Sequence, residues 1–322
     1  MSFEITTAFV DQFRSQLFHL SQQMGSRLRD AVRQESQNGE SAFYERLGIT
    51  AAQKRTSRHA DTPRVDVPHS RRRVDLEDYD IADLIDQEDR IRMLIDPASD
   101  YARSFIFALG RAMDTAIIEA SRGNAFSGRN GGTNVAHPIS QKLLSFELGT
   151  AGAITTKGLD VDALRRAKKL LDQNEVDSSI RRYCVLPAEQ VQSLLEETEV
   201  TSSDFATVKA LVQGEVNSFM GFDFIRTELT EQESAFFNDT ATTGGAILSS
   251  VDGTITNADR VLCFATDGVL LAVGKDMAAR IDERPDKNYA TQVFASMSIG
   301  ATRLEEEKVV DIVCRTPSSV IS

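Results

Sequence analysis

The sequence predicts an α+β fold, because clear helical patterns and clear strand patterns occur in different parts of one chain. One observation is a long amphipathic pattern over residues 97–122 that ends at Gly123, which predicts a helix. The other is the C-terminal part, where every second residue of 293–299 is apolar and 309–314 is an apolar run; both patterns predict strands. No internal repeat is visible.

Length and composition indicate a globular protein kept in a cytosol. A chain of 322 residues allows roughly two domains of about 150 residues, and a core of that size needs neither disulfides nor a metal. No run approaches the roughly 18 apolar residues of a membrane span, and Met1–Arg14 lacks the features of a secretory signal. Cys184, Cys263 and Cys314 are far apart and flanked by apolar residues, so we expect buried free thiols.

The net charge of −12 argues against binding of nucleic acid through the molecule as a whole, because phosphate contacts need clustered Lys and Arg. Trp is absent and aromatic residues make up 7% of the chain, which also argues against a base-stacking surface.

The N-terminal quarter predicts an arm followed by a long loop. Apolar residues recur every three or four positions in 5–33 and form one narrow stripe, so this helical or extended arm should lie on another domain or subunit. Residues 44–73 contain eight basic and three acidic residues, a local charge of +5. A loop of this length is functional or disordered. The alternation of Val65 and Val67 favours an extended hairpin arm.

The charge then reverses. Residues 75–100 hold ten acids and two arginines, a local charge of −8. Apolar residues between Ile81 and Ile95 predict a helix with one buried side and an acidic outer side. The long helix follows, with Asp96 as N-cap and Pro97 at its first position, and about 25 residues give a rod of roughly 40 Å. Residues 125–138 predict a flexible loop.

Downstream, the patterns mix helices and strands. Helices are expected at 161–171 and from Pro187, and strands at 181–186 and around 222–224. Residues 260–274 predict a β-hairpin with Asp267-Gly268 at its turn.

Catalytic and ligand-binding patterns are missing from the sequence. The four histidines lie in predicted arm or loop segments, and no nucleophile-elbow pattern occurs. Asp78–Asp83 matches two positions of a calcium-binding EF-hand loop but lacks its glycine, and Ser127–Thr133 lacks the Lys-Ser/Thr of a phosphate-binding loop. We therefore predict no catalytic, cofactor-binding or metal-binding residue.

The junction between Arg71–Arg73 and the following acids predicts a contact between protein surfaces. A nucleic-acid patch is less economical, because the arginines have neither a second basic cluster nor interleaved aromatic residues. If the basic loop does not fold back onto its own chain, the arginines of one copy would pair with the acids of the next in a head-to-tail assembly. The candidate contact residues are Arg71, Arg72 and Arg73 on one copy and Asp78, Asp80, Asp83, Asp86, Glu88 and Asp89 on the next.

The order of these segments resembles the major capsid protein of tailed bacteriophages, with the fold first described for phage Hong Kong ninety-seven. The resemblance rests on "FVDQFRSQLFHLSQQMGSRLRDAV", "RRRVDLEDYDIADLIDQEDRIRMLIDP", "YCVLPAEQVQSLL" and "GEVNSFMGFDFIRTE", in that order. It implies an N-arm at 1–43, an extended loop (E-loop) at 44–78, a peripheral domain at 79–165 and 281–322 with a spine helix at 97–122, and an axial domain at 166–280. In such shells the extended loop lies over the peripheral domain of a neighbouring subunit.

The resemblance also implies a function and partners. A structural, non-enzymatic protein would assemble into pentamers and hexamers of an icosahedral head that encloses double-stranded DNA without sequence-specific binding. Further implied partners are a separate scaffolding protein, a portal protein and, in some such heads, a cement protein, with assembly in the host bacterial cytoplasm and no role for a membrane. Two alternatives remain: an encapsulin-type shell around cargo proteins, and a soluble α+β enzyme.

Overall fold

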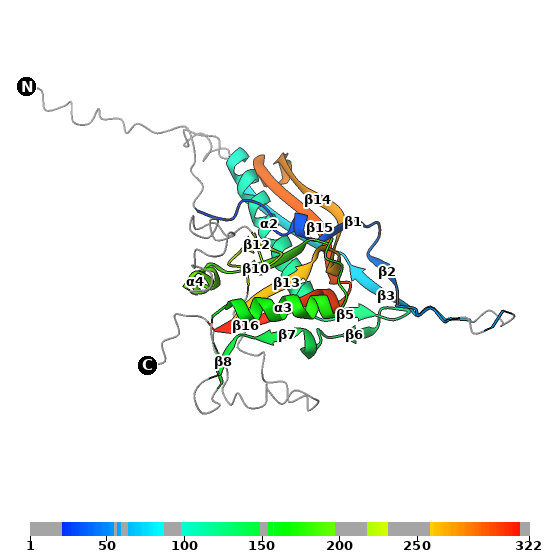
Figure 1. Cartoon of the computed structure of the whole chain (residues 1–322). Helices are drawn as coiled ribbons and strands as arrows, with labels where there is room; N and C mark the ends of the chain where they lie inside the picture. Colours follow the sequence, from blue (N-terminus) through cyan, green and yellow to red (C-terminus); the bar gives the residue numbers. More distant parts are fainter. Residues whose placement is uncertain are drawn as a thin grey trace, which may run out of the picture. The chain divides into compact units, whose positions relative to one another are not determined.

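The computed structural model describes residues 21–54, 57–58, 64–86, 98–148, 154–156, 158–196, 218–230 and 258–315 (Figure 1). They form two compact units. Unit 1 comprises Met1–Ser26, Glu77–Met113 and Lys275–Ile299, and unit 2 comprises Arg27–Leu76, Asp114–Gly274 and Gly300–Ser322. The boundaries of these units differ from those of the predicted peripheral and axial domains. The division into peripheral and axial domains stays a prediction. Within the described residues, no helix combines the length and the apolar character that a membrane crossing requires.

Unit 1 is built on a sheet and on the first part of a long helix. Helix α2 spans Ala98–Arg122, which confirms the predicted rod. One contact of α2 with the arm lies at Gly110, where a Cβ atom would come within 2.5 Å of the Gly25 carbonyl carbon, so only glycine lets the arm pass this closely. The predicted apolar stripe of the arm lies mostly outside the described residues, and 21–32 contain only the 3-10 turn η2 (Arg29–Ala31).

One four-stranded sheet has the order β1-β14-β15-β4, with β1 at Arg33–Ser36, β14 at Val269–Arg284, β15 at Ala290–Arg303 and β4 at Glu77–Ile85. Unit 1 holds β4 and the parts of β14 and β15 that lie within 275–299. Strands β4 and β15 are antiparallel, from Ile85 opposite Thr291 to Glu77 opposite Ile299. Ile85 and Val293 pack against Phe105 of α2. The strand expected at 293–299 is confirmed.

The predicted acidic helix is wrong over its described part, because residues 77–85 form the edge strand β4. Ile81 and Ile85 are four residues apart, a spacing that places two side chains on one face of a helix and equally on one face of a strand. The acids Asp78 and Asp80 are exposed on the other face. The rest of the predicted helix, with Asp96 and Pro97, lies outside the described residues.

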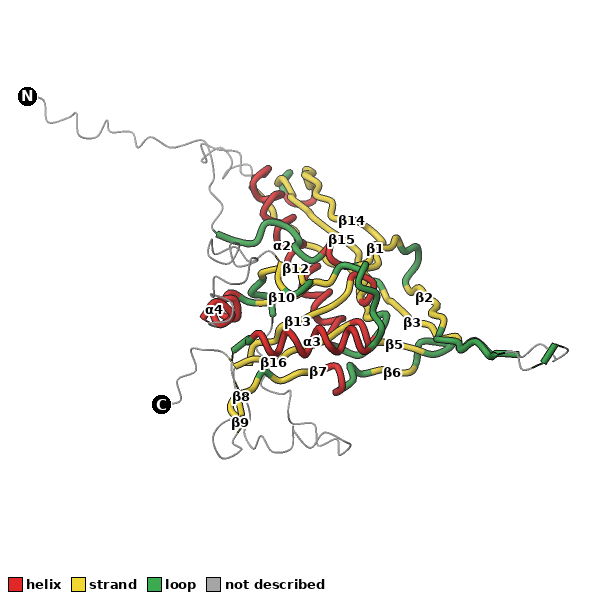
Figure 2. The backbone as a smooth tube through the Cα atoms, in the orientation of Figure 1, coloured by secondary structure: helices red, strands yellow, loops and turns green. Residues whose placement is uncertain are grey.

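Unit 2 contains a six-stranded sheet with the order β11-β12-β10-β13-β16-β7. Two helices cover one face of it, α3 (Val161–Gln173) and α4 (Ala188–Glu196) (Figure 2). Asp160 caps α3 by accepting a 2.7 Å hydrogen bond from the Ala163 N–H. The strands are β11 (Ser218–Phe219), β12 (Phe222–Arg226), β10 (Arg182–Leu186), β13 (Ala258–Ala265), β16 (Val309–Arg315) and β7 (Lys142–Leu144).

All three cysteines are buried free thiols in this core, as expected. Burial raises the pKa of the Cys184 and Cys314 thiols well above the usual value, so both stay protonated and unreactive. The helices at 161–171 and from Pro187 and the strands at 181–186, 222–224 and 309–314 are confirmed.

The predicted hairpin at 260–274 is wrong. Strand β13 pairs with β10 and β16, the 3-10 turn η5 (Thr266–Gly268) follows, and β14 belongs to the other sheet. At the turn, the Gly268 carbonyl accepts a hydrogen bond from the Leu304 N–H and the Thr266 N–H donates to the Arg181 carbonyl. Residues far away in the sequence therefore form the backbone hydrogen bonds of this turn, and the local sequence contains no signal for them.

A further sheet of four strands has the order β2-β3-β5-β6. Strands β5 (Ala125–Ser127) and β6 (Thr133–Val135) form a hairpin, so the flexible loop expected at 125–138 is wrong. Gly128 and Gly131 at its tip have φ of +96° and +67°, a left-handed region that glycine enters without strain. Strands β8 (Phe146–Leu148) and β9 (Ile154–Thr156) form a separate pair.

Candidate assembly site at the base of the β2–β3 hairpin

The predicted extended loop is a β-hairpin. Strands β2 (Ser41–Leu47) and β3 (His69–Asp75) are antiparallel, with Ser41 opposite Asp75 and Leu47 opposite His69. Figure 1 shows the chain continuing outward beyond both strands. Leu47 is 70% exposed and Ile49 is 93% exposed, so the outer part presents apolar side chains to solvent. The extended hairpin arm is confirmed.

The base of this hairpin is held by a cluster of charges around Glu306. Arg72 of β3 is 1% exposed, and its guanidinium donates to the Glu306 carboxylate and, at 3.4 Å, to the Leu304 carbonyl. Arg46 of β2 donates to the same carbonyl and lies 3.5 Å from the other Glu306 oxygen. One carboxylate therefore ties both strands to the turn before β16.

Arg303 completes the cluster from within the same unit. Its side chain is 0% exposed, and its guanidinium donates to the carbonyls of Ser121 at 2.9 Å and Gly123 at 2.8 Å. These carbonyls are at the C-terminus of α2, where a helix favours a cation. The Nε atom of Arg303 lies 3.9 Å from Glu306. Burial lowers the pKa of Arg303 to about 10, with Arg72 adding to this effect and Glu306 opposing it.

The two flanking arginines of the junction lie nearer the surface. Arg71 pairs with Glu45 on the opposite strand at 3.0 Å and lies over the Phe43 ring. Arg73 pairs with Asp75 at 2.6 Å and lies over the Phe126 ring of β5. Both arginine side chains are half-buried, and their carboxylate partners are exposed. Ion pairs that solvent reaches in this way contribute under about 1 kcal/mol each.

The predicted contact residues therefore differ in what they can do. Arg72 is buried in its own chain, where its guanidinium pairs with Glu306. Contact of Arg71 or Arg73 with a neighbouring copy stays a prediction. Of the predicted acids, Asp78, Asp80, Asp83 and Asp86 are exposed, and Asp78 accepts a hydrogen bond from Ser298; Glu88 and Asp89 lie outside the described residues.

A second buried charge cluster joins the end of α2 to the six-stranded sheet. Asp311 of β16 is fully buried and accepts a 2.9 Å hydrogen bond from the Arg260 Nε atom. The Arg122 Nε atom lies 3.4 Å from the other carboxylate oxygen, and Arg122 also donates to the Arg260 carbonyl at 2.8 Å. Burial raises the pKa of Asp311, but the charges of Arg122 and Arg260 outweigh burial and hold it below its usual value.

Sequence reasoning missed both clusters. The one available signal was a charge inside an apolar run, as with Asp311 in "VVDIVC" and Arg303 after 290–302. A charged residue in such a run lies either on the exposed face of a strand or in a buried ion pair, and only the fold identifies its partner. Among the described residues, no group of three or more His, Cys, Asp and Glu side chains is arranged to hold a metal ion.

A sequence model of the family described as "Phage capsid protein" matches residues 5–316. The chain is a member of the phage capsid protein family. The predicted family, the α+β fold and the structural, non-enzymatic role of a major capsid protein in the virion are thereby confirmed. No curated protein is significantly similar to the chain.

Solved capsid structures share the fold of this capsid protein. The capsid of Ralstonia phage GP4 superposes with a TM-score of 0.70 at 11% identity and covers 97% of this chain and 96% of its own. The capsid of cyanophage P-SCSP1u gives 0.68 at 16% identity, covering 96% and 93%. The acid-stable capsid of Helicobacter pylori bacteriophage KHP30 gives 0.68 at 12% identity, covering 98% of each chain. At these identities the similarity establishes the fold.

Proposed function

We propose that this capsid protein assembles into pentamers and hexamers of an icosahedral phage head that encloses double-stranded DNA. The single observation that carries the proposal is the β2–β3 hairpin, which has a buried ionic anchor at its base and exposed Leu47 and Ile49 beyond it. An anchored strand pair that presents apolar side chains to water is suited to a surface on another molecule. The hairpin would act as the extended loop, residues 44–78, on a neighbouring copy.

Edge strand β4 is the surface we assign to that contact. It lies at one end of its sheet and presents the exposed acids Asp78, Asp80 and Asp83. Charged residues on an edge strand discourage uncontrolled strand pairing. They also offer carboxylates to the basic hairpin, including Arg71 and Arg73, so that charge complementarity would set which copies meet. Residues 79–165 and 281–322 would then form the peripheral domain, and 166–280 the axial domain.

Further partners follow from this function. A separate scaffolding protein would direct assembly in the host bacterial cytoplasm, a portal protein would occupy one vertex, and a cement protein is an optional addition. The net charge of −12 would keep the shell from binding the packaged DNA tightly, because a largely acidic wall repels phosphates. An encapsulin-type shell is the alternative; nuclease-protected DNA in purified particles favours a phage head, and packaged protein favours the alternative.

The proposal is tested by shortening the hairpin. A variant in which a short Gly-Ser turn replaces residues 49–67 keeps both strands and the Glu306 cluster. Expressed together with the scaffolding protein, the native chain should form shells in negative-stain micrographs, and the shortened chain should stay folded by circular dichroism while sedimenting as small species. Normal shells from the shortened chain would contradict the role of the hairpin.

A further inference from the structure

The outer face of α3 is basic in a strongly acidic protein. Val161, Leu164 and Leu171 bury the inner side of the helix against the six-stranded sheet. Arg165, Arg166, Lys168 and Lys169 occupy the outward-facing and flanking positions within a single turn and a half. Asp162 pairs with Arg165 at 2.8 Å, and Asp172 pairs with Arg182 at 2.7 Å. Within the described part of the chain, neither Lys168 nor Lys169 forms an ion pair.

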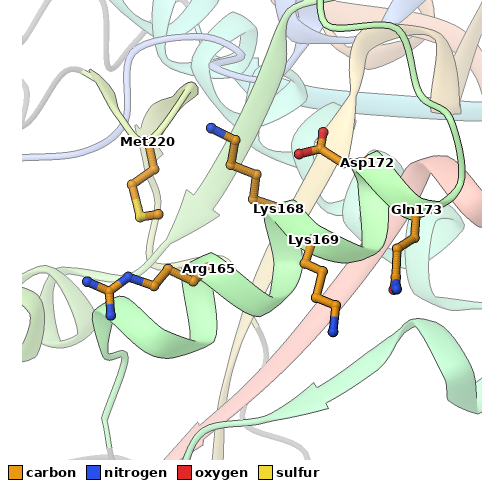
Figure 3. Close-up of a pocket in the computed structure, with 6 residues that line it drawn as sticks. All are labelled: Arg165, Lys168, Lys169, Asp172, Gln173 and Met220. Carbon is orange, nitrogen blue, oxygen red and sulfur yellow. The ribbon is translucent and has the colours of Figure 1, made fainter.

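These side chains border a shallow groove between α3 and the β11–β12 turn (Figure 3). The groove has a volume of about 460 Å³. Figure 3 shows Arg165 and Lys168 on the side of the helix that faces Met220, and Lys169 on the opposite side. The lining residues are Arg165, Lys168, Lys169, Asp172, Gln173 and Met220, which together carry a charge of +2.

An acidic hollow of about 520 Å³ lies beside the start of α4, the second helix on the same face of the sheet. Among the described residues that line it are three carboxylates and no cation, a charge of −3. Glu189 and Glu228 are exposed, and Asp259 is buried and accepts a 2.8 Å hydrogen bond from Gln190. Glu228 also accepts a 2.9 Å hydrogen bond from the Ala188 N–H, which offsets the positive end of the α4 dipole.

The hollow also contains a buried polar group that lacks a partner. Thr230 lines it and is 5% exposed, and among the described residues its hydroxyl has no hydrogen-bond partner. Buried hydroxyls are usually satisfied, so this one points to a group that arrives from outside. Because no described set of carboxylates is arranged to hold a metal ion, a charged side chain suits the hollow better than a bare cation.

We propose that the basic face of α3 in one copy docks on the acidic hollow at α4 of the next copy in the same ring. This inference rests on the proposed capsid function. The two surfaces carry opposite charge and lie in one helical layer over one sheet, so each copy can offer α3 to one neighbour and α4 to the other. Such a heterologous contact closes into a ring, in which every α3 and every α4 has a partner. Long-range attraction between them would guide and orient the encounter.

The test is a charge swap between Lys168 and Glu189. We expect Lys168→Glu alone and Glu189→Lys alone each to lower the yield of shells by about tenfold, because each places like charges face to face. The double variant restores the attraction between copies and should recover most of the yield. Lys287→Glu, an equal charge change at an exposed position of η6 (Pro285–Lys287), is the matched control. Circular dichroism of each unassembled chain checks that it folds.

The outcomes separate this inference from the proposed function. Recovery in the double variant supports the contact. Normal shells from both single variants would overturn the contact while leaving the capsid function intact, and a double variant as defective as the singles would also overturn it. A native chain that forms no shells even when it is expressed together with its scaffolding protein would instead contradict the proposed function. If Lys168→Glu abolishes binding of a labelled DNA duplex but leaves assembly normal, α3 is a phosphate-binding surface and the contact is rejected.

Discussion

Glu306→Gln tests whether one carboxylate anchors the hairpin. Glu306 balances Arg72 and Arg46 by direct contact and lies 3.9 Å from the Nε atom of fully buried Arg303. Removing one partner of a buried pair leaves a charge uncompensated, at a cost of about 3–5 kcal/mol. Burial already lowers the pKa of Arg72, with Glu306 opposing that effect, so the loss of Glu306 leaves an unfavourable buried cation. We expect the free energy of unfolding to fall by that amount.

Equilibrium urea unfolding of the unassembled chain measures the effect. Glu305→Gln is the matched control, because Glu305 is the preceding residue, is 41% exposed and pairs with Lys308 at 3.0 Å. Exposed pairs of this kind contribute under about 1 kcal/mol. Equal losses in the two variants would refute the anchoring role of Glu306.

Three further predictions concern other sites. Burial lowers the pKa of His137 to about 4, with Arg303 and Lys142 adding to this effect and Asp311 opposing it. As the pH falls, the unfolded chain therefore binds the proton before the folded chain does. The His137 contribution to the free energy of unfolding is full above about pH 6.5, and roughly 3 kcal/mol of it is lost by pH 4. His137→Asn should flatten that pH dependence of the unfolding free energy. Asp311→Asn should cost about 3–5 kcal/mol in urea unfolding, because Arg122 and Arg260 lose their buried counter-ion; a loss under about 1 kcal/mol would contradict this. Ile49→Asp should change stability by under about 0.5 kcal/mol yet reduce shell formation in sedimentation assays.

The elements that the sequence predicts correctly are those whose signals are local. Helix α2 has a periodic apolar face and a glycine stop, and its described bounds, Ala98–Arg122, match the expected rod. Helix α3 similarly has its Asp160 cap and its apolar face within a few residues of each other. The hairpin arm was also predictable, since the alternation of Val65 and Val67 within a long polar, basic segment favours an extended conformation.

The failures have a common physical cause, which is that the deciding contacts lie far away in sequence. The turn at Asp267-Gly268 joins two strands that belong to different sheets, because β10 and β16 compete successfully for β13. Residues 77–85 become a strand because β15 provides a complete antiparallel partner. In the site, Arg72 and Glu306 are 234 residues apart, so no local pattern could pair them.

The central claim is that the β2–β3 hairpin, fixed at its base by Glu306, reaches a neighbouring copy. A cryo-electron microscopy reconstruction of the assembled particle tests it most directly. We predict that residues 47–68 of one copy lie on β4 of the next, with Arg71 or Arg73 within ion-pair distance of Asp78, Asp80 or Asp83. A hairpin that contacts only its own chain in the assembled shell would contradict the account.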